Sequence, residues 1–231
     1  PQLRWAKGTR VMPINRINLL LASQGLCIRG GLLCTPEDQV PGDCASLILI
    51  GHAGGKMWQA FQAARQDEPD PLDNWTRRII EPLAVKLGAQ ALYPFDGPPW
   101  LPFQRWAMKA EGISPSPIGP LIHPEFGLWH GYRAALGFAA ILPVPQPEKG
   151  RDICGGCQAK PCLSACPACV FASGRYDVPR CVNYLKSEGN SCLAGGCLAR
   201  CACPVGAEYA YGPDQASFHT RAFLNAIDRF L

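Results

Sequence analysis

Apolar residues recur at two spacings in the first 150 residues, and these spacings predict helices and strands in alternation. Residues 14–24 and 55–65 carry apolar side chains at helical spacing. Residues 46–50 form a short apolar run before a glycine, which is typical of a buried strand, and residues 89–95 again have a strand-like composition. We therefore expect an α+β domain in this part of the chain.

The clearest single helix is predicted to begin at Pro71. Asp70 is suited to the N-cap position and Pro71 to the first helical position. One apolar stripe follows at a spacing of four residues: Trp75, Ile79, Leu83 and Leu87. Pro82 predicts a kink inside this helix, and Gly88 is the expected stop.

Three later segments set the predicted domain boundaries. Residues 93–106 are dense in aromatic residues and prolines, and we expect either a surface loop or the wall of a flat ligand site. Residues 133–142 fit a strand or a helix equally well, and 144–150 is a polar, proline-rich boundary. We predict domains at 1–148 and 149–212, followed by an amphipathic helix at 213–231. The apolar face of that helix carries Phe218, Phe223, Ile227 and Phe230.

Composition narrows the class of protein. The chain has 231 residues, 48% of them hydrophobic and 17% charged, which is enough apolar material for a packed core. Its net charge of +4 is spread along the chain, and this argues against nucleic acid as a partner. No apolar run reaches the ~18 residues of a membrane span, and no signal-peptide pattern is present. We expect a cytoplasmic protein without a membrane partner.

The 13 cysteines change this picture most. An odd number cannot all pair within one chain, and ten of them lie between Cys154 and Cys203. Disulfide frameworks usually stabilise small secreted domains that lack a core, whereas the first 150 residues here can form one. That part contains only Cys27, Cys34 and Cys44, which we expect to be small buried hydrophobic residues. The local density of cysteines therefore indicates a metal site.

The cysteine spacing indicates iron–sulfur clusters. The first series is Cys154-x2-Cys157-x4-Cys162-x3-Cys166-Pro167, similar to the bacterial ferredoxin run C-x2-C-x2-C-x3-C-P. A second series, Cys181, Cys192, Cys197 and Cys203, also ends before a proline. In the ferredoxin run three cysteines bind one cluster and the fourth reaches the other. We therefore predict a C-terminal, bacterial-ferredoxin-like module with two [4Fe–4S] clusters.

The crossed pattern divides eight cysteines between the two clusters. The first cluster takes Cys154, Cys157, Cys162 and Cys203, and the second takes Cys166, Cys181, Cys192 and Cys197. Cys169 and Cys201 are left over. Cys201 is an alternative to Cys192, because Cys197-x3-Cys201 also resembles a cluster spacing. Structural zinc is the alternative metal, although zinc sites usually show paired CxxC motifs and only Cys154 and Cys157 form one here.

The C-terminal third resembles a known two-cluster module. Residues 150–205 are similar to the dicluster module of epoxyqueuosine reductase and the reductive dehalogenases. The segment 180–188, RCVNYLKSE, resembles the segment that carries a lone cysteine in that module. The resemblance implies that Cys181 is a cluster ligand.

Residues 46–143 resemble the cobalamin-processing family that decyanates and dealkylates vitamin B12. The resemblance lies in Asp70-Pro71-Leu72-Asp73, in Gly88-Ala89 before Tyr93, and most specifically in IHPEFGLW at 122–129. It implies a nitroreductase-like fold and cobalamin bound base-off, and the arginine at the position of Arg133 contacts glutathione in that family. The implied cofactor contacts are His123, Phe126, Gly127, Trp129, Arg133 and Tyr93, with Phe95 as a further candidate.

The sequence also departs from that family. The processing family has no iron–sulfur cluster, and the base-off motif DxHxxG is absent because Ile50 stands where the aspartate of the motif belongs, ahead of His52 and Gly55. Structural interpretations stay open as well. His123 is suited to capping a turn, the aromatic residues to a core, and Arg133 to an ion pair with Glu125 or Asp96.

Together these features predict an iron–sulfur oxidoreductase that passes electrons from an external donor to a bound corrinoid. The donor would be a ferredoxin, a flavodoxin or a reductase. One alternative is a ferredoxin-type electron carrier without a corrinoid. The other is an oxidoreductase like epoxyqueuosine reductase, although the sequence offers no candidate for its catalytic acid and no basic surface for RNA.

Overall fold

The computed structural model describes residues 14–144, 147, 150 and 152–230, with residues 14, 15 and 228–230 described by their backbone alone. The chain divides into two compact units. The sheet unit comprises residues up to 52 together with 59–111 and 132–147. The cysteine unit comprises 53–58, 112–131 and the chain from 148 onward.

A four-stranded sheet organises the sheet unit, with strand order β1-β2-β6-β3. These strands are β1 (Cys27–Leu33), β2 (Ser46–Ala53), β6 (His130–Phe138) and β3 (Gln90–Leu92). β1 pairs antiparallel with β2, and β3 pairs antiparallel with β6. β2 is buried over nearly its whole length, which explains why it reads as a continuous apolar run.

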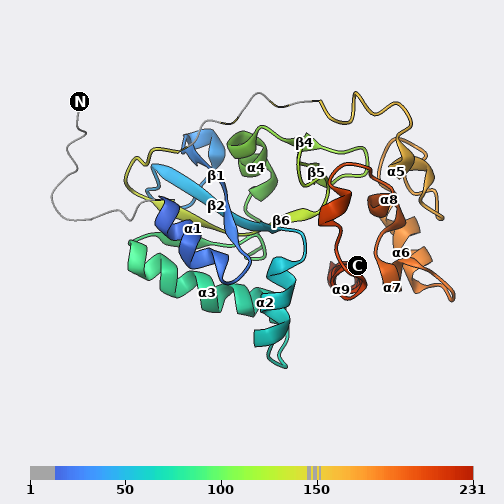
Figure 1. The fold of residues 1–231 in the computed structure, drawn as a ribbon, viewed down its shortest axis with the longest axis horizontal. Helices are drawn as coiled ribbons and strands as arrows, with labels where there is room; N and C mark the ends of the chain where they lie inside the picture. The colour runs from blue at the N-terminus through green and yellow to red at the C-terminus, as the bar shows by residue number, and fades with distance from the viewer. Residues whose placement is uncertain (1–13, 145–146, 148–149, 151, 231) are drawn as a thin grey trace. The chain divides into compact units, whose positions relative to one another are not determined.

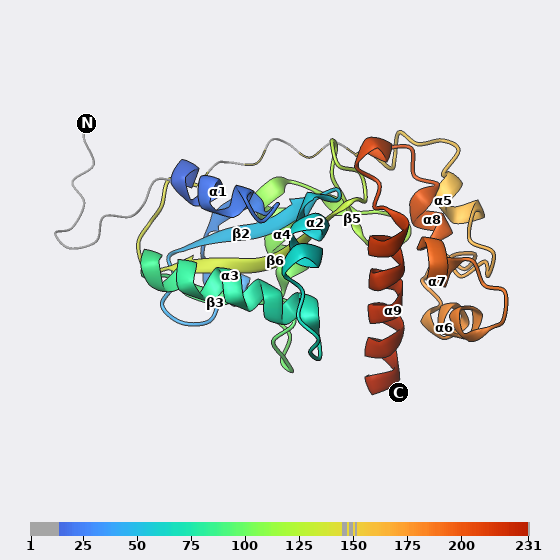
Figure 2. The ribbon, with the colours of Figure 1, turned by 60° about the horizontal axis from the view of Figure 1, so that its bottom comes forward.

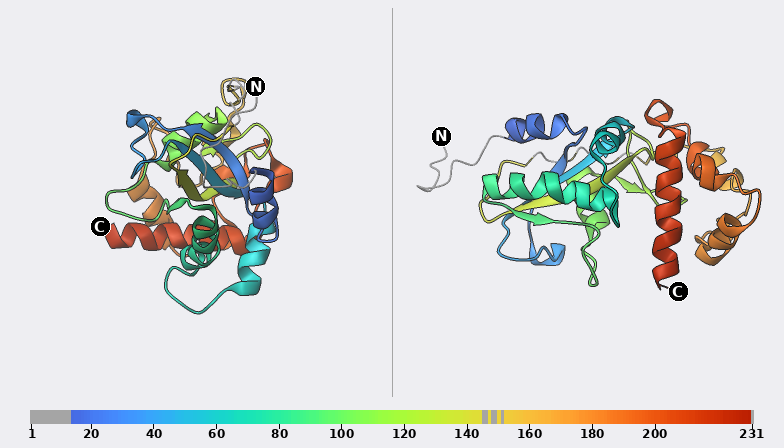
Figure 3. Two further views of the ribbon diagram at one scale, coloured as in Figure 1. Left: turned by 90° about the vertical axis from the view of Figure 1, so that its left-hand side faces the viewer. Right: turned by 90° about the horizontal axis from the view of Figure 1, so that it is seen from below.

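Helices surround these strands in the sheet unit (Figure 3). They are α1 (Ile14–Ala22), α3 (Pro71–Leu87), α4 (Phe103–Glu111), the 3₁₀ helix η1 (Pro36–Asp38) and α2 (Lys56–Ala64), of which residues 59–64 belong to this unit. Figure 1 shows α3 and α4 on opposite sides of the strands. The apolar side chains between these layers form the core, including Ile48, Ile50, Phe61, Ile80 and Trp106.

The ends of α3 follow the sequence signals. Asp70 occupies the N-cap position, and its carbonyl accepts hydrogen bonds from the amides of Asp73 and Asn74. Gly88 ends the helix with a φ of 62°, a left-handed conformation that favours glycine. The helix continues through Pro82 from residue 71 to 87.

Two segments whose sequence pattern fits more than one structure, 93–106 and 133–142, form regular elements. Helix α4 begins at Phe103, in the second half of the segment 93–106. Its buried side chains recur at helical spacing: Phe103, Trp106, Ala107 and Ala110. The Trp106 indole nitrogen donates a 2.7 Å hydrogen bond to the carbonyl of Asp38, which joins α4 to η1. Most of 133–142 continues β6. The expected mixed α/β composition is therefore confirmed, with a small antiparallel sheet and covering helices.

The cysteine unit is built from short elements and one long helix. It contains the hairpin of β4 (Ser114–Pro115) and β5 (Leu121–Ile122), followed by α5 (Pro161–Ser164), α6 (Val178–Lys186), α7 (Cys192–Gly195) and α8 (Leu198–Cys201). The 3₁₀ helix η2 (Ala207–Tyr209) and α9 (Pro213–Phe230) complete it. Its core joins Ile118, Ile122 and Leu128 to Val170, Phe171, Ala199 and Cys203.

Helix α9 packs within the cysteine unit beside α7 (Figure 2). The Ser217 hydroxyl donates to the carbonyl of Leu193 at 2.6 Å, and the Phe218 ring lies 5.0 Å from that of Trp58. The predicted apolar face also includes Phe230, whose side chain lies outside the described residues. No described helix has the length and apolar character needed to cross a membrane.

The cysteine unit is discontinuous in the sequence. Residues 53–58 and 112–131 belong to it together with the chain from 148 onward, and the boundaries at 148 and 212 stay predictions. The reason is visible at Gly127, where an added Cβ would lie 1.8 Å from the carbonyl oxygen of Val205. This approach between distant parts of the chain leaves no signal in local sequence patterns.

Candidate metal centres

All 13 cysteines are free thiols in the structure. Those of the sheet unit are Cys27, Cys34 and Cys44, and they are partly exposed rather than fully buried as expected. Burial raises the pKa of the Cys34 thiol to about 11, with a smaller contribution from Cys44. The ten remaining cysteines belong to the cysteine unit.

Four thiols of the cysteine unit line one cavity. This first cysteine group consists of Cys154, Cys157, Cys162 and Cys203. The rest of the cavity wall is largely apolar and includes Ile122, Leu128, Ile153, Pro204 and Val205. A pocket with several thiols and apolar walls is suited to a buried metal cluster, because the walls limit access of water.

Local backbone structure presents the thiols of the first group. The amide of Cys157 donates to the carbonyl of Cys154 at 3.3 Å, and the Asp152 carboxylate accepts from the amide of Gly155 at 2.7 Å. Cys162 lies in the first turn of α5, directly after Pro161. Cys203 follows α8 at a turn and is followed by Pro204, so it reaches the cavity from another part of the chain.

The thiols of the first group also influence one another electrostatically. Burial raises the pKa of the Cys154 thiol, and the neighbouring Cys203, Cys162 and Cys157 raise it further. Burial and then Cys203 and Cys157 likewise raise the pKa of Cys162. Close thiols resist joint ionisation unless a cation is present, and metal binding supplies that positive charge. The donor set therefore fits an iron–sulfur cluster.

A second cysteine group consists of Cys166, Cys181, Cys192 and Cys197. Burial raises the pKa of the Cys181 thiol, a hydrogen bond from Tyr176 opposes this, and Cys197 and Cys166 raise it further. Burial also raises the pKa of Cys192, and its thiol neighbours are Cys197, Cys166 and Cys181. The second group thus contains the four cysteines that the crossed pattern assigns to one cluster.

Cys169 and Cys201 are the two cysteines of this unit outside these groups. Both are exposed, as is Cys197 of the second group, whereas Cys192 is buried. Burial and then Cys197 raise the pKa of Cys201, and Arg200 lowers it. Cys192 thus has three thiols of the second group as neighbours, and this favours it over Cys201 as a ligand.

The alternative to a cluster is a site for a single metal ion. Within the described parts of the chain, no three His, Cys, Asp or Glu side chains are arranged to hold one metal ion.

The predicted corrinoid contacts fall into both units, and each has protein partners. The His123 ring accepts hydrogen bonds at Nδ1 from the amides of Glu125 and Phe126, at 3.1 and 3.2 Å, and stacks on the Phe126 ring at 4.3 Å. His123 therefore caps a turn, as the structural interpretation of the sequence allowed. Trp129 is buried, with its ring 5.3 Å from that of Tyr211 and the Arg200 guanidinium 4.7 Å above it.

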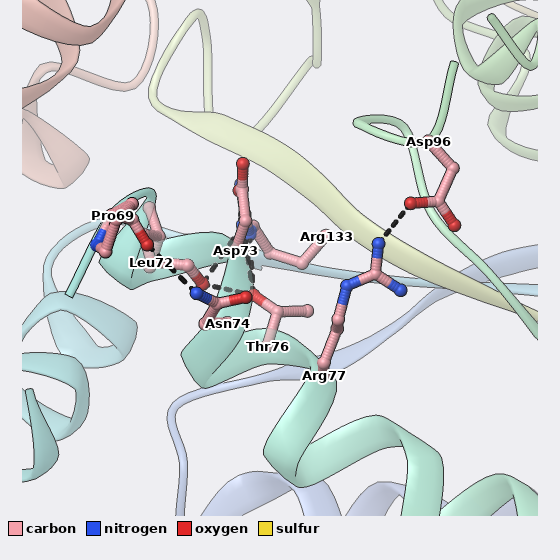
Figure 4. Close-up of polar contacts among 8 residues, drawn as sticks. All are labelled: Pro69, Leu72, Asp73, Asn74, Thr76, Arg77, Asp96 and Arg133. Carbon is pink, nitrogen blue, oxygen red and sulfur yellow. Dashed lines mark hydrogen bonds and ion pairs between the residues drawn. The ribbon is translucent and has the colours of Figure 1, made fainter. Parts of the chain in front are cut away.

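Arg133 and Tyr93 belong to the sheet unit. Arg133 donates to the Asp73 carboxylate at 2.5 Å, to the Thr76 hydroxyl at 3.0 Å and to the carbonyl of Leu72 at 3.3 Å (Figure 4). Its acidic partner is Asp73 of α3, and the pairs expected with Glu125 or Asp96 do not occur among the described ion pairs. Asp96 instead pairs with Arg77 (Figure 4).

Tyr93 has both aromatic and charged neighbours. Its ring stacks on Phe95 at 5.1 Å, and the Arg77 guanidinium lies 4.5 Å above it. Burial raises the pKa of the Tyr93 hydroxyl to about 12. His123 and Arg133 thus have hydrogen-bond partners of their own, whereas the Tyr93 hydroxyl and the Trp129 indole nitrogen are buried without one among the described residues. His123, Phe126, Gly127 and Trp129 belong to the cysteine unit, and Arg133 and Tyr93 belong to the sheet unit.

Comparison with known proteins shows which solved structures have a fold similar to that of this chain. No family model matches the sequence, and no curated protein matches it. The epoxyqueuosine reductase from Streptococcus thermophilus is a structural neighbour, with a TM-score of 0.53, 16% identity and coverage of 89% of this chain and 70% of its own. A selenomethionine-labelled epoxyqueuosine reductase gives a TM-score of 0.50 at 16% identity, covering 80% of this chain and 54% of its own. The fold is therefore similar to that of epoxyqueuosine reductases.

Proposed function

We propose that this chain is an iron–sulfur electron-transfer protein with two [4Fe–4S] clusters. The first would be held by Cys154, Cys157, Cys162 and Cys203, and the second by Cys166, Cys181, Cys192 and Cys197. The observation that carries the proposal is the cavity of the first cysteine group, which is lined by four thiols from two distant parts of the chain.

A cluster ligated by four thiolates exchanges single electrons and leaves no open coordination site for a substrate. The chain's own part is to present the thiols and to exclude water. The apolar wall around the first cysteine group includes Ile122, Leu128 and Val205. The similarity of fold to epoxyqueuosine reductases supports the oxidoreductase class.

The proposed partner is an external electron donor such as a ferredoxin, a flavodoxin or a reductase. Each group contains one buried cysteine, Cys203 in the first and Cys192 in the second, but the second group also contains the exposed Cys197. An exposed ligand brings a redox centre close to the surface, where a docked donor can reach it. The second group is therefore the better place for a donor to bind.

Metal analysis tests the proposal directly. Anaerobically reconstituted protein should contain about eight iron and about eight sulfide per chain. About four of each would mean that one cysteine group holds no cluster. About two zinc per chain without visible absorption would contradict the proposal.

A corrinoid electron acceptor is a narrower candidate, and it rests on the resemblance at residues 122–133. Anaerobic titration with cob(III)alamin and cob(II)alamin tests it, and a shift of the corrinoid spectrum to the base-off form would support it. Absence of binding at about 50 μM would leave an electron carrier without a corrinoid.

An oxidoreductase that acts on epoxyqueuosine is the other candidate, and the similarity of fold favours it. Its test is the conversion of epoxyqueuosine to queuosine by the reduced protein. Turnover would establish this activity. Oxidation of the protein by other acceptors without turnover would favour the carrier.

A further inference from the structure

One hydroxyl group shares the cavity of the first cysteine group. Ser116 lines this cavity together with the four thiols. The residue is only 7% exposed, and its hydroxyl oxygen is buried with no hydrogen-bond partner among the described residues. Buried polar groups are nearly always hydrogen-bonded, so an unpaired hydroxyl in a cavity points to a partner that occupies the cavity.

The β4–β5 hairpin fixes the position of Ser116. The Ser116 amide donates to the carbonyl of Pro120 at 2.8 Å, and its carbonyl accepts from the amide of Gly119 at 2.9 Å. Both backbone groups of Ser116 are therefore satisfied within the turn, and the hydroxyl is the group left to bond elsewhere. Ile122 of the same hairpin also lines the cavity, which makes the hairpin part of its wall.

The chemistry of the cavity defines the acceptor. The wall around Ser116 is largely apolar, and its four thiols would become sulfur ligands of a metal cluster. The thiolates and sulfides of such a cluster are anionic sulfur acceptors. Lys160 also lines the cavity, but it is an exposed residue whose charge solvent screens. Ser116 is thus the buried donor at this site.

We propose that the Ser116 hydroxyl donates a hydrogen bond to a sulfur of the cluster held by the first cysteine group and raises its reduction potential. The inference rests on the proposed function of that group. Reduction adds an electron to an already anionic cluster, so a donor to sulfur stabilises the reduced form more than the oxidised form. Hydrogen bonds to the sulfurs are among the features that set cluster potentials.

A redox titration of the holoprotein, followed by electron paramagnetic resonance, tests the inference. In Ser116→Ala the potential of one cluster should fall, with up to about a tenfold change in its ratio of oxidised to reduced form, or ~59 mV for a one-electron couple. The potential of the other cluster should not change. Ser114→Ala is the matched control, because Ser114 lies on the same hairpin with an exposed side chain.

Iron content separates failure of this inference from failure of the proposed function. Wild-type protein without about eight iron per chain would overturn the proposed function itself. If Ser116→Ala keeps the wild-type iron content and both wild-type potentials, the hydrogen bond is refuted while the two clusters stand.

A second pair of variants decides the question if Ser116→Ala loses iron. Ser116→Thr and Ser116→Val have nearly the same shape and differ in the hydroxyl. The threonine variant should keep a higher potential at the first cluster than the valine variant. Equal potentials in the two would overturn the inference.

Discussion

At the scale of single residues, burial separates Cys192, which the spacing assigns to the second cluster, from its alternative Cys201. Cys192 and Cys201 both lie at cluster-like distances from Cys197 in the sequence, but Cys192 is buried among the thiols of the second group whereas Cys201 is exposed beside Arg200. Sequence spacing ranks such candidates only weakly. Their three-dimensional neighbours supply the missing information.

This difference predicts opposite iron contents for two variants. Cys192→Ala should lose the second cluster and hold about four iron per chain, because one of its four ligands is removed. Cys201→Ala should keep about eight. Iron and sulfide analysis after anaerobic reconstitution measures both, and the reverse result would reassign the ligand.

Arg133 makes a second prediction at this scale. Arg133→Ala removes the hydrogen bonds to Asp73 and Thr76, and Thr76 is fully buried. The free energy of unfolding should fall by about 1–3 kcal/mol, measured by urea denaturation. Arg78→Ala, which removes a surface pair with Glu68, should change it by less than about 0.5 kcal/mol. An Arg133→Ala protein with wild-type stability but altered binding of cobalamin would instead favour the cofactor contact that the resemblance implies.

At the scale of elements, prediction succeeded where local chemistry marks the ends of a helix. Helix α3 begins at Pro71 after Asp70 and ends at Gly88, as these residues predict, although the Asp70 side chain makes no capping hydrogen bond. Helix α4 was missed because Pro98, Pro99 and the neighbouring aromatic residues dominate its segment. Its helical spacing, with Phe103, Trp106 and Ala110 buried, was present in the sequence.

The junction of η1 and α4 gives a pH-dependent prediction. Burial raises the pKa of the Asp38 carboxyl, but hydrogen bonds from Lys109 and Thr35 outweigh burial, and the net pKa is lowered. A lowered pKa in the folded state stabilises the protein above the unfolded value of about 3.9, and this stabilisation is lost as the pH falls through the folded value.

Lys109→Met should therefore lower the urea midpoint at pH 7 and at pH 5. The difference from wild type should begin to shrink below about pH 4, where Asp38 becomes protonated in the unfolded chain, and should be lost only below the lowered pKa of the folded wild type. Lys56→Met, at an exposed position at the start of α2, should show a smaller difference at pH 7. A constant Lys109→Met effect from pH 7 to pH 3 would show that the charge of Asp38 is not involved.

The candidate site was predictable to the extent that its parts are close in sequence. The spacing of Cys154, Cys157 and Cys162 predicts a tight loop from the local sequence alone. The contribution of Ser116 comes from a hairpin about 40 residues earlier, which nothing in the local pattern connects to these thiols. The close approach of Gly127 to Val205 is equally non-local.

At the scale of the whole molecule, the two units differ in what holds them together. The sheet unit has a conventional core of aliphatic and aromatic side chains on β2, α2 and α3. The core of the cysteine unit includes Cys203, and several proposed ligands pack against it: Cys154, Cys162, Cys166 and Cys181. Metal binding and folding should therefore be coupled in the cysteine unit.

Removal of iron tests this coupling. Oxidative chelation should raise amide hydrogen exchange in residues 152–212 by about tenfold or more, because the loops that present the thiols lose their common anchor. The amides of β2 and of residues 132–138 of β6 should keep their protection. Equal losses of amide protection in both units, or none in either, would show that the cysteine unit does not depend on metal separately from the sheet unit.

The arrangement of the cavity also has a consequence for the synthesis of the protein. Cys162 leaves the ribosome about 40 residues ahead of Cys203, so the first group lacks one thiol for roughly 2–8 s at ordinary elongation rates. During that interval three nascent thiols are exposed to oxidants and to competing metal ions. Faithful loading of the first group thus depends on delivery of iron and sulfide after Cys203 has emerged.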